Sequence, residues 1–459
     1  MKHWMTAAEI SRAYAAGTLS PVTLTESLIE RIDQLEPQYH AFIHLDRAAA
    51  LASAQHAQRE LQAGRSLGPL HGVPVGIKDI IDMEGQTTSC HSVVMRQHKA
   101  KVDAPVITAL RAAGAMTFGK LALHEFAIGG PSFDLPFPPA RNPWNINHHP
   151  GGSSSGSGTA LAAGFLPLAL GTDTGGSVRH PAAACGLVGL KPTYDLVSRR
   201  GVYPLAMSLD HVGPMARSVE DVALLLDVMA RTSSPATHPR PESYTRDLKL
   251  GVKGLRIGFI RHFHEKDDLA DPEVTLALEN ACDVFRKLGA QVRDINLPSL
   301  QAFSSPQKVI LMAEGWAVHA RNLRERPEDY AQMSRRKLLC GAFLGGGDYV
   351  QAMQRRGELI DAVNQAFGEV DILLAANSFE PACRIDDLSE VVRTYTRQAR
   401  VPFNLTGHPA LAMMSGLSTS GLPLSLQLIG KNFDEATVLR AGAAFEQATP
   451  WHTMHPDLN

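Results

Sequence analysis

The chain has 459 residues, 44% of them apolar and 20% charged, which is typical of a folded globular protein. Its formal net charge of −2 indicates neither a nucleic-acid-binding nor an anionic-membrane-binding surface. No stretch approaches ~18 apolar residues, and the N-terminus lacks a signal peptide's apolar segment, so neither a membrane span nor secretion is expected. The five cysteines form no CxxC pair, so we expect a cytoplasmic protein without a disulfide framework or zinc ribbon.

The first 65 residues are predicted to be helical. Thr6 and Glu9 have the spacing of a capping box at the start of the first helix, and Pro21 suits the first turn of the second. We expect residues 1–65 to form a helical cover over the rest of the protein. The predicted helices span residues 6–16, 20–35 and 47–63.

From residue 66 onward, short β-branched segments alternate with helical ones, which predicts an α/β fold. Asp103 is expected to cap one helix, and the Asp271-Pro272 pair to open another. A polar stretch at 232–249 is expected to be a surface loop. Strands are predicted at 71–82, 116–119, 255–260, 291–296, 370–375, 410–414 and 423–429, and helices at 103–113, 218–230, 271–288, 305–368 and 434–447.

Two segments dense in glycine and hydroxyl residues, 151–158 and 171–179, are candidates for chemistry. Glycine permits unusual backbone angles, and successive free N–H groups form an anion-binding nest. The first segment ends an irregular stretch at 128–158, and so long a stretch in a compact protein is usually functional. The alternative is a pair of flexible linkers.

A serine hydroxyl becomes a good nucleophile only when a base takes its proton. Lysine serves as that base when burial lowers its pKa toward neutrality. Lys78 follows the apolar strand Val75-Gly76-Ile77 and is a candidate. The alternative is that Lys78 lies at a strand end with its amine in water.

The span Gly72–Thr193 closely resembles the amidase signature family, and two C-terminal segments extend the similarity. This resemblance implies an α/β amidase signature fold, with a central mixed β-sheet surrounded by α-helices. It also implies one domain over residues 66–459, with a catalytic core at 71–215 and a variable substrate-pocket region at about 216–410. The matching segments are GVPVGIKD (72–79), EFA (125–127), NPWN (142–145), GGSS (151–154), GTDTGGS (171–177), CGLVGLKPT (185–193), GLP (421–423) and QLIG (427–430).

The resemblance implies a Ser-Ser-Lys triad. Ser177 takes the place of the nucleophile, Ser153 that of a bridging serine after a cis peptide bond, and Lys78 that of the base. Backbone N–H groups of residues 174–177 are implied to form the oxyanion hole. The implied oxyanion-hole residues are Thr174, Gly175, Gly176 and Ser177, and the supporting residues are Gly152, Ser154, Thr172, Asp173 and Arg179.

In the mechanism that follows, neutral Lys78 accepts a proton from Ser153 while Ser153 accepts one from Ser177. Ser177 attacks the amide carbonyl, and water later hydrolyses the acyl-enzyme. Neither a metal nor an organic cofactor is expected. The expected partner is a small-molecule amide, with no nucleic acid and no membrane, and a homodimer is left open.

Other motif interpretations are weaker. The spacing Gly152-x-Ser154-x-Gly156 matches a nucleophile elbow, but the preceding His148-His149-Pro150 is not a strand. No Gly-Lys-Ser/Thr follows the glycines, which argues against a P-loop. Adjacent histidines on a loop are more often solvent-facing than metal-binding, and His180 receives no assignment.

Arg179 has two interpretations: its guanidinium contacts a substrate carboxylate or carbonyl, or it braces the loop through an ion pair with Asp173. The second is favoured.

The chain departs from the family pattern in places. Ser155 and Gly158 stand where Gly and Ala are common. The turn Ala376-Asn377-Ser378 replaces a Thr-Pro-Thr-like turn, which changes a wall near the site. Candidate lining residues for the substrate pocket are Phe126, Ile128 and Trp316.

The first functional hypothesis is a free-standing amidase acting on a small carboxamide, anilide or related C–N bond. The alternative is the glutamine-hydrolysing A subunit of a tRNA-dependent amidotransferase, which would require partner subunits. A catalytically dead binding protein is disfavoured, because the lysine and both serines are present.

Overall fold

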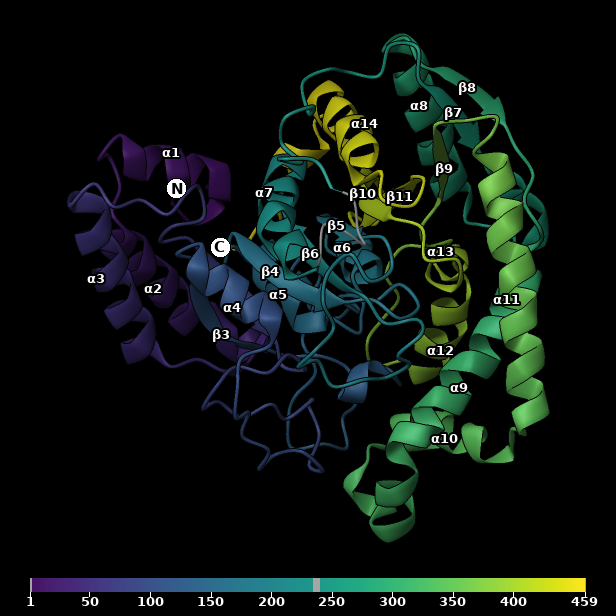
Figure 1. Cartoon of the computed structure of the whole chain (residues 1–459), viewed down its shortest axis with the longest axis horizontal. Helices are drawn as coiled ribbons and strands as arrows, with labels where there is room; N and C mark the ends of the chain where they lie inside the picture. Colours follow the sequence, from purple (N-terminus) through teal and green to yellow (C-terminus); the bar gives the residue numbers. More distant parts are fainter. Residues whose placement is uncertain (1, 234–239, 459) are drawn as a thin grey trace.

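The computed structural model describes residues 2–233 and 240–458, and its centre is one 11-stranded mixed β-sheet (Figure 1). The expected α/β fold with helices around a central mixed sheet is confirmed. The strand order is β1-β3-β2-β4-β6-β5-β10-β11-β9-β7-β8. The strands are β1 (Phe42–His44), β2 (Pro74–Lys78), β3 (Met116–Leu121), β4 (Leu168–Thr172), β5 (Val188–Lys191), β6 (Val212–Ala216), β7 (Arg256–Phe259), β8 (Gln291–Asp294), β9 (Ile372–Ala376), β10 (Ala410–Leu417) and β11 (Pro423–Ile429).

Helices cover the sheet, and most lie where the apolar periodicity predicts them. They are α1 (Ala7–Ala15), α2 (Pro21–Tyr39), α3 (Arg47–Gln62), α4 (Pro105–Ala112), α5 (Ser155–Ala162), α6 (Arg179–Ala184), α7 (Val219–Met229), α8 (Pro272–Lys287), α9 (Leu300–Glu325), α10 (Gln332–Leu339), α11 (Gly346–Ala366), α12 (Leu388–Thr396), α13 (Val401–Leu405) and α14 (Glu435–Ala448).

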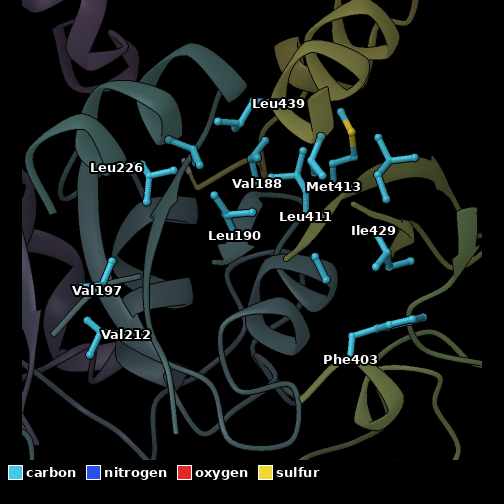
Figure 2. Packing of buried hydrophobic residues seen from close by; sticks show 14 of the residues in the cluster. Val188, Leu190, Val197, Val212, Leu226, Phe403, Leu411, Met413, Ile429 and Leu439 are labelled. Atoms are coloured by element: carbon cyan, nitrogen blue, oxygen red, sulfur yellow. The ribbon is translucent and has the colours of Figure 1, made fainter. Parts of the chain in front are cut away.

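The centre of the sheet is buried on both faces because helices pack on each side. Every residue of β2, β4, β5, β6, β9 and β11 is buried. Figure 2 shows part of this core, where Val188 and Leu190 of β5 lie near Leu411 of β10 and Leu439 of α14. Strands buried on both faces are expected to be apolar throughout, so a charged side chain at such a strand's end requires a specific reason.

Parallel pairing aligns the two strand ends that carry catalytic candidates. β2 runs parallel to β4, with Ile77 opposite Leu170. Parallel neighbours end at the same edge of a sheet, so Lys78 at the end of β2 and Thr172 at the end of β4 lie side by side. This edge also receives the Gly/Ser segments that precede α5 and α6.

The N-terminal helices form where local capping predicts them. Thr6 and Glu9 make both halves of the capping box, and Ser20 caps α2 with Pro21 in the first turn. However, α2 continues to Tyr39, four residues beyond the expected end at 35, and it contains Pro37. The division into a cover at 1–65 and a domain at 66–459 stays a prediction.

Several local expectations were wrong because long-range contacts decide them. Asp103 does not cap α4: its carboxylate accepts the Glu84 N–H and pairs with Arg111. α5 begins at Ser155, inside the stretch expected to be irregular, because burial on all sides stabilises this Gly/Ser-rich turn of helix. Part of the loop expected at 232–249, residues 234–239, lies outside the described residues.

Helices α12 and α13 were not predicted. They lie between β9 and β10 in the chain, and Figure 1 shows them between the sheet and the long helices α9 and α11. Both are short, and their apolar residues pack on distant elements, so local periodicity gives only a weak signal. They carry residues of the site described next.

Candidate active site

Lys78 is the only charged group of β2, and its side chain is fully buried. Its Nζ donates to Ser153 Oγ at 2.9 Å, to Ser154 Oγ at 2.9 Å and to Thr172 Oγ1 at 2.7 Å. The amine therefore does not reach water, and the alternative of a snorkelling lysine is wrong.

Burial lowers the pKa of Lys78 to about 7, although the negative charges of Asp173 and Asp210 oppose the shift. A neutral amine has two N–H donors and one lone pair. The Ser154 hydroxyl donates to the Thr172 carbonyl at 3.3 Å, so it accepts from Lys78 rather than giving it a proton. In the neutral amine the lone pair therefore faces Ser153 or Thr172, and a proton relay through Ser153 requires the first of these arrangements.

The peptide bond between Gly152 and Ser153 is cis, as the resemblance implies. A side chain at Gly152 would be blocked, because a Cβ there would lie 2.1 Å from Cε1 of His124. The Ser153 carbonyl accepts the His124 N–H at 3.0 Å. The ring and backbone of His124 thus confine the Gly152–Ser153 bond from one side.

Three histidines surround this bond, and none of them was assigned from the sequence. His149 Nδ1 accepts the Gly151 N–H at 3.1 Å, and His180 Nδ1 accepts the Gly152 N–H at 3.3 Å. The Nε2 atoms of His149 and His124 lie 3.3 Å apart. Burial lowers the pKa of all three, that of His149 to about 4, so they are neutral acceptors at neutral pH.

The expectation that His148 and His149 face solvent is wrong for His149, which is buried. Its ring is committed to Gly151 and His124. Within residues 2–233 and 240–458, no three His, Cys, Asp or Glu side chains are grouped to hold a metal ion.

Ser177 lies in the loop between β4 and α6 and is buried. Its carbonyl accepts the Ser154 N–H at 3.2 Å, which joins the two Gly/Ser segments. No direct hydrogen bond links the Ser153 and Ser177 hydroxyls in the described structure. The Lys78–Ser153 hydrogen bond that the relay requires is therefore present, and the Ser153–Ser177 hydrogen bond stays a prediction.

Asp173 organises the nucleophile loop, residues 172–178, which carries Ser177. Its carboxylate accepts the N–H groups of Gly176 at 2.7 Å and Val178 at 3.1 Å. Burial alone would raise the pKa of Asp173, but the Arg179 charge and hydrogen bonds hold it well below its usual range. A permanently ionised carboxylate thus fixes the backbone on both sides of Ser177.

Arg179 is completely engaged. Its Nε and Nη2 contact Asp173 at 3.1 Å each, while its other hydrogen bonds reach Asn404, Gln427 and the Arg400 carbonyl. The side chain has no exposed surface. Of the two interpretations, the brace is the one observed, and contact between Arg179 and a substrate carboxylate is wrong.

One expected oxyanion-hole donor needs correction. The Gly176 N–H already donates to Asp173 and is not free to meet an oxyanion. Among the described hydrogen bonds, none starts at the backbone N–H of Thr174, Gly175 or Ser177. Their role as oxyanion-hole donors stays a prediction.

Two further residues beside Ser177 come from the variable region. The Tyr395 phenol of α12 has a pKa raised by burial, and a side-chain hydrogen bond with Ser177 opposes that rise. Arg400 follows α12, and the side chain lies against Gly176, where a Cβ would be 2.5 Å from Nε. Neither belongs to a recognisable motif, so the sequence offers no signal for them.

The suggested pocket lining is not supported. Phe126 is fully buried, its ring 4.5 Å from that of His319 and 5.4 Å from that of Tyr330. Ile128 belongs to the core, and Trp316 lies under the Arg324 guanidinium. By contrast, the unusual turn at 376–378 does reach the site, because Asn377 and Ser378 both contact Arg400.

Comparison with known proteins agrees with this architecture. A sequence model of the Amidase family matches residues 23–439. The chain is 38% identical to the A subunit of a glutamyl-tRNA(Gln) amidotransferase from Chloroflexus aggregans and 39% identical to its counterpart from Roseiflexus sp., with 99% of each chain covered. It therefore belongs to the Amidase family, the amidase signature enzymes that hydrolyse amide C–N bonds.

Solved structures give the same result. The peptide amidase of Stenotrophomonas maltophilia superposes with a TM-score of 0.85 at 30% identity, covering 97% of each chain. A second solved structure has a TM-score of 0.88 at 32% identity, and the match covers 99% of this chain and 100% of that one. That structure is described as part of a vestigial protein complex that reveals the evolutionary origins of an s-triazine catabolic enzyme. No helix among the described residues is long and apolar enough to cross a membrane.

Proposed function

We propose that the chain hydrolyses a small carboxamide, anilide or related amide through an acyl-enzyme on Ser177. The observation that carries the proposal is the environment of Lys78, a buried amine with a pKa of about 7 that contacts Ser153 at 2.9 Å. A base of that pKa is half neutral near pH 7 and works best there.

In the proposed mechanism, Lys78 takes the Ser153 proton while Ser153 takes the Ser177 proton. The Ser177 oxygen then bonds to the amide carbon, and the carbonyl oxygen becomes an oxyanion near the free amides of Thr174, Gly175 and Ser177. Each such donor is worth roughly 3 kcal/mol in other enzymes. The relay returns a proton to the leaving nitrogen, the C–N bond breaks, and water hydrolyses the ester.

The test is turnover of pentanamide and acetanilide by the purified chain. We expect Ser177→Ala to abolish hydrolysis and Lys78→Ala to reduce it at least ~10²-fold at neutral pH while the fold stays intact. Ser157→Ala is a matched control, because the described hydrogen bond of the Ser157 hydroxyl goes to the Leu170 carbonyl of β4 and to no group of the proposed triad. Hydroxylamine should trap the acyl group as a hydroxamate with wild type only.

Wild-type rates in Ser177→Ala, or a hydroxamate formed without Ser177, would contradict the proposal.

A second candidate is the glutamine-hydrolysing subunit of a tRNA-dependent amidotransferase. It is favoured by the identity of 38–39% over 99% of the chain to relatives named as such subunits. A cytoplasmic location suits both candidates. If the chain alone is inactive on simple amides and releases ammonia from glutamine only with partner subunits, this second function is correct. Turnover of pentanamide or acetanilide without partners supports the first.

A further inference from the structure

Arg400 is a buried cation without a described ion pair. Only 1% of its surface is exposed, and its assigned side-chain hydrogen bonds all start at Nη1, to Asn377 and Ser378. Its Nε is buried without a hydrogen-bond partner, and the carboxylate whose charge acts on it, Asp173, is already paired with Arg179. Burying a cation is costly unless an anion compensates it, so the guanidinium is poised for a negative group that the chain does not supply.

The position of Arg400 ties it to catalysis rather than to general packing. Its side chain lies on Gly176, the residue before the nucleophile, where a Cβ would be 2.5 Å from Nε and 2.6 Å from Cδ. The backbone carbonyl of Arg400 accepts from Arg179 Nη1 at 3.0 Å, which fixes the segment against the nucleophile loop. The Arg400 side chain therefore lies beside the residue that precedes Ser177.

A second cation lies nearby. Lys337 Nζ is 5.1 Å from the ring centroid of Tyr395, the residue that interacts with Ser177, and its described hydrogen bond goes to the Gly129 carbonyl at 2.7 Å. Of the acidic groups around α12, Glu380 and Glu390 contact Arg393, Glu380 also contacts Arg397, and Asp387 accepts N–H groups at the start of the helix. Lys337 and Arg400 therefore place two basic side chains on the side of Tyr395, while the carboxylate whose charge acts on Arg400, Asp173, is paired with Arg179.

We propose that Arg400 binds a carboxylate on the acyl part of the substrate, and that the preferred substrates are half-amides of short dicarboxylic acids. This inference rests on the proposed hydrolase function. A guanidinium fork matches a carboxylate with two parallel hydrogen bonds. The acyl part is favoured over the leaving group because it stays attached to Ser177, beside Gly176, after the C–N bond breaks. A substrate that also carries an ammonium group would meet Lys337 and no free carboxylate.

Three amides of the same chain length test the proposal. Pentanamide is neutral, glutaramate adds a terminal carboxylate, and glutamine adds an ammonium group next to that carboxylate. We expect wild type to prefer glutaramate to pentanamide by roughly 10²-fold in kcat/KM, the usual scale for a buried charge-assisted contact. Glutamine should be a poorer substrate than glutaramate.

Arg400→Met should reduce the glutaramate-to-pentanamide ratio to near one, and Arg400→Lys should restore part of it. Arg440→Met is the matched control: Arg440 is a half-buried arginine on α14 that donates to the Gly251 carbonyl, and its loss should leave the ratio unchanged. Circular dichroism and a thermal melt of each variant identify any that fail to fold. The ratio is independent of how much folded enzyme each preparation contains.

Three results separate the outcomes. Equal losses of both activities in Arg400→Met, or no wild-type preference for glutaramate while Ser177-dependent turnover persists, overturn the carboxylate subsite and leave the hydrolase assignment intact. A preference for glutamine over glutaramate overturns it in favour of a zwitterion site. Turnover that survives Ser177→Ala overturns the proposed function itself.

Discussion

Lys78 shows how burial changes the chemistry of a single residue. Removing its amine from water lowers its pKa from 10.5 to about 7, and three hydroxyl groups replace the lost hydration. Asp173 limits the shift through its negative charge, which the Arg179 pair keeps permanent. The balance between burial and this charge sets the pKa of Lys78 near neutrality.

The first prediction at this scale concerns pH. Because Lys78 must be neutral to accept a proton, kcat/KM should rise with pH and reach half its maximum near pH 7. We expect no second step in this pH profile near neutrality from His124, His149 or His180, since burial lowers the pKa of each. The measurement is kcat/KM for pentanamide from about pH 5 to pH 9. A profile that is flat over this range would show that another group is the base.

The nucleophile loop, residues 172–178, is the element that turns these residues into a site. Asp173 holds its N–H groups, Arg179 braces Asp173, and Arg400 packs on Gly176. The loop needs glycine at 176, where φ is +120° and a Cβ would meet Arg400 at 2.5 Å. Gly175 is different, because the nearest atom to a Cβ there is Gln307 Nε2 at 3.5 Å.

The corresponding prediction is a contrast in stability between two neighbouring substitutions. Gly176→Ala should lower the free energy of unfolding by about 2–4 kcal/mol, because it adds both backbone strain and a clash. Gly175→Ala should change the same quantity by less than about 1 kcal/mol. Urea unfolding followed by tryptophan fluorescence measures both. Similar losses for the two variants would mean that the loop tolerates no side chain at either position, for a reason other than Arg400.

At the scale of the whole molecule, one carboxylate of α7 holds the start of the N-terminal helix α1. Asp221, on α7, accepts the N–H groups of Ala7 at 2.8 Å and Ala8 at 3.0 Å, which are free donors at the start of α1. Burial raises the pKa of Asp221 to about 6, so this attachment weakens as the carboxylate gains its proton below that pH. Figure 1 shows α1, α2 and α3 gathered at one side of the molecule, away from α9 and α12.

We therefore expect Asp221→Ala to loosen α1 without disturbing catalysis directly. The free energy of unfolding should fall by about 1–3 kcal/mol, the usual result of leaving buried donors unsatisfied. Hydrogen–deuterium exchange should quicken in residues 7–15 while kcat stays within about twofold of wild type. Asp227→Ala, on the same helix but bonded to Ser243 and Tyr244, is the control and should leave exchange in α1 unchanged. Protection of residues 7–15 that survives in Asp221→Ala would refute this view of the attachment.

Much of this protein follows from local sequence. Thr6, Ser20 and Asp271 begin helices because each side chain caps an N–H within three residues of itself. Lys78 and Ser177 are recognisable because they lie in ordered motifs.

Only the tertiary structure decides what surrounds those motifs. Arg179 is saturated by Asn404 and Gln427, which lie 225 and 248 residues away, and Gly176 is closed off by Arg400. The physical reason is that a buried charge is defined by every group packed around it, and chain segments hundreds of residues apart supply those groups.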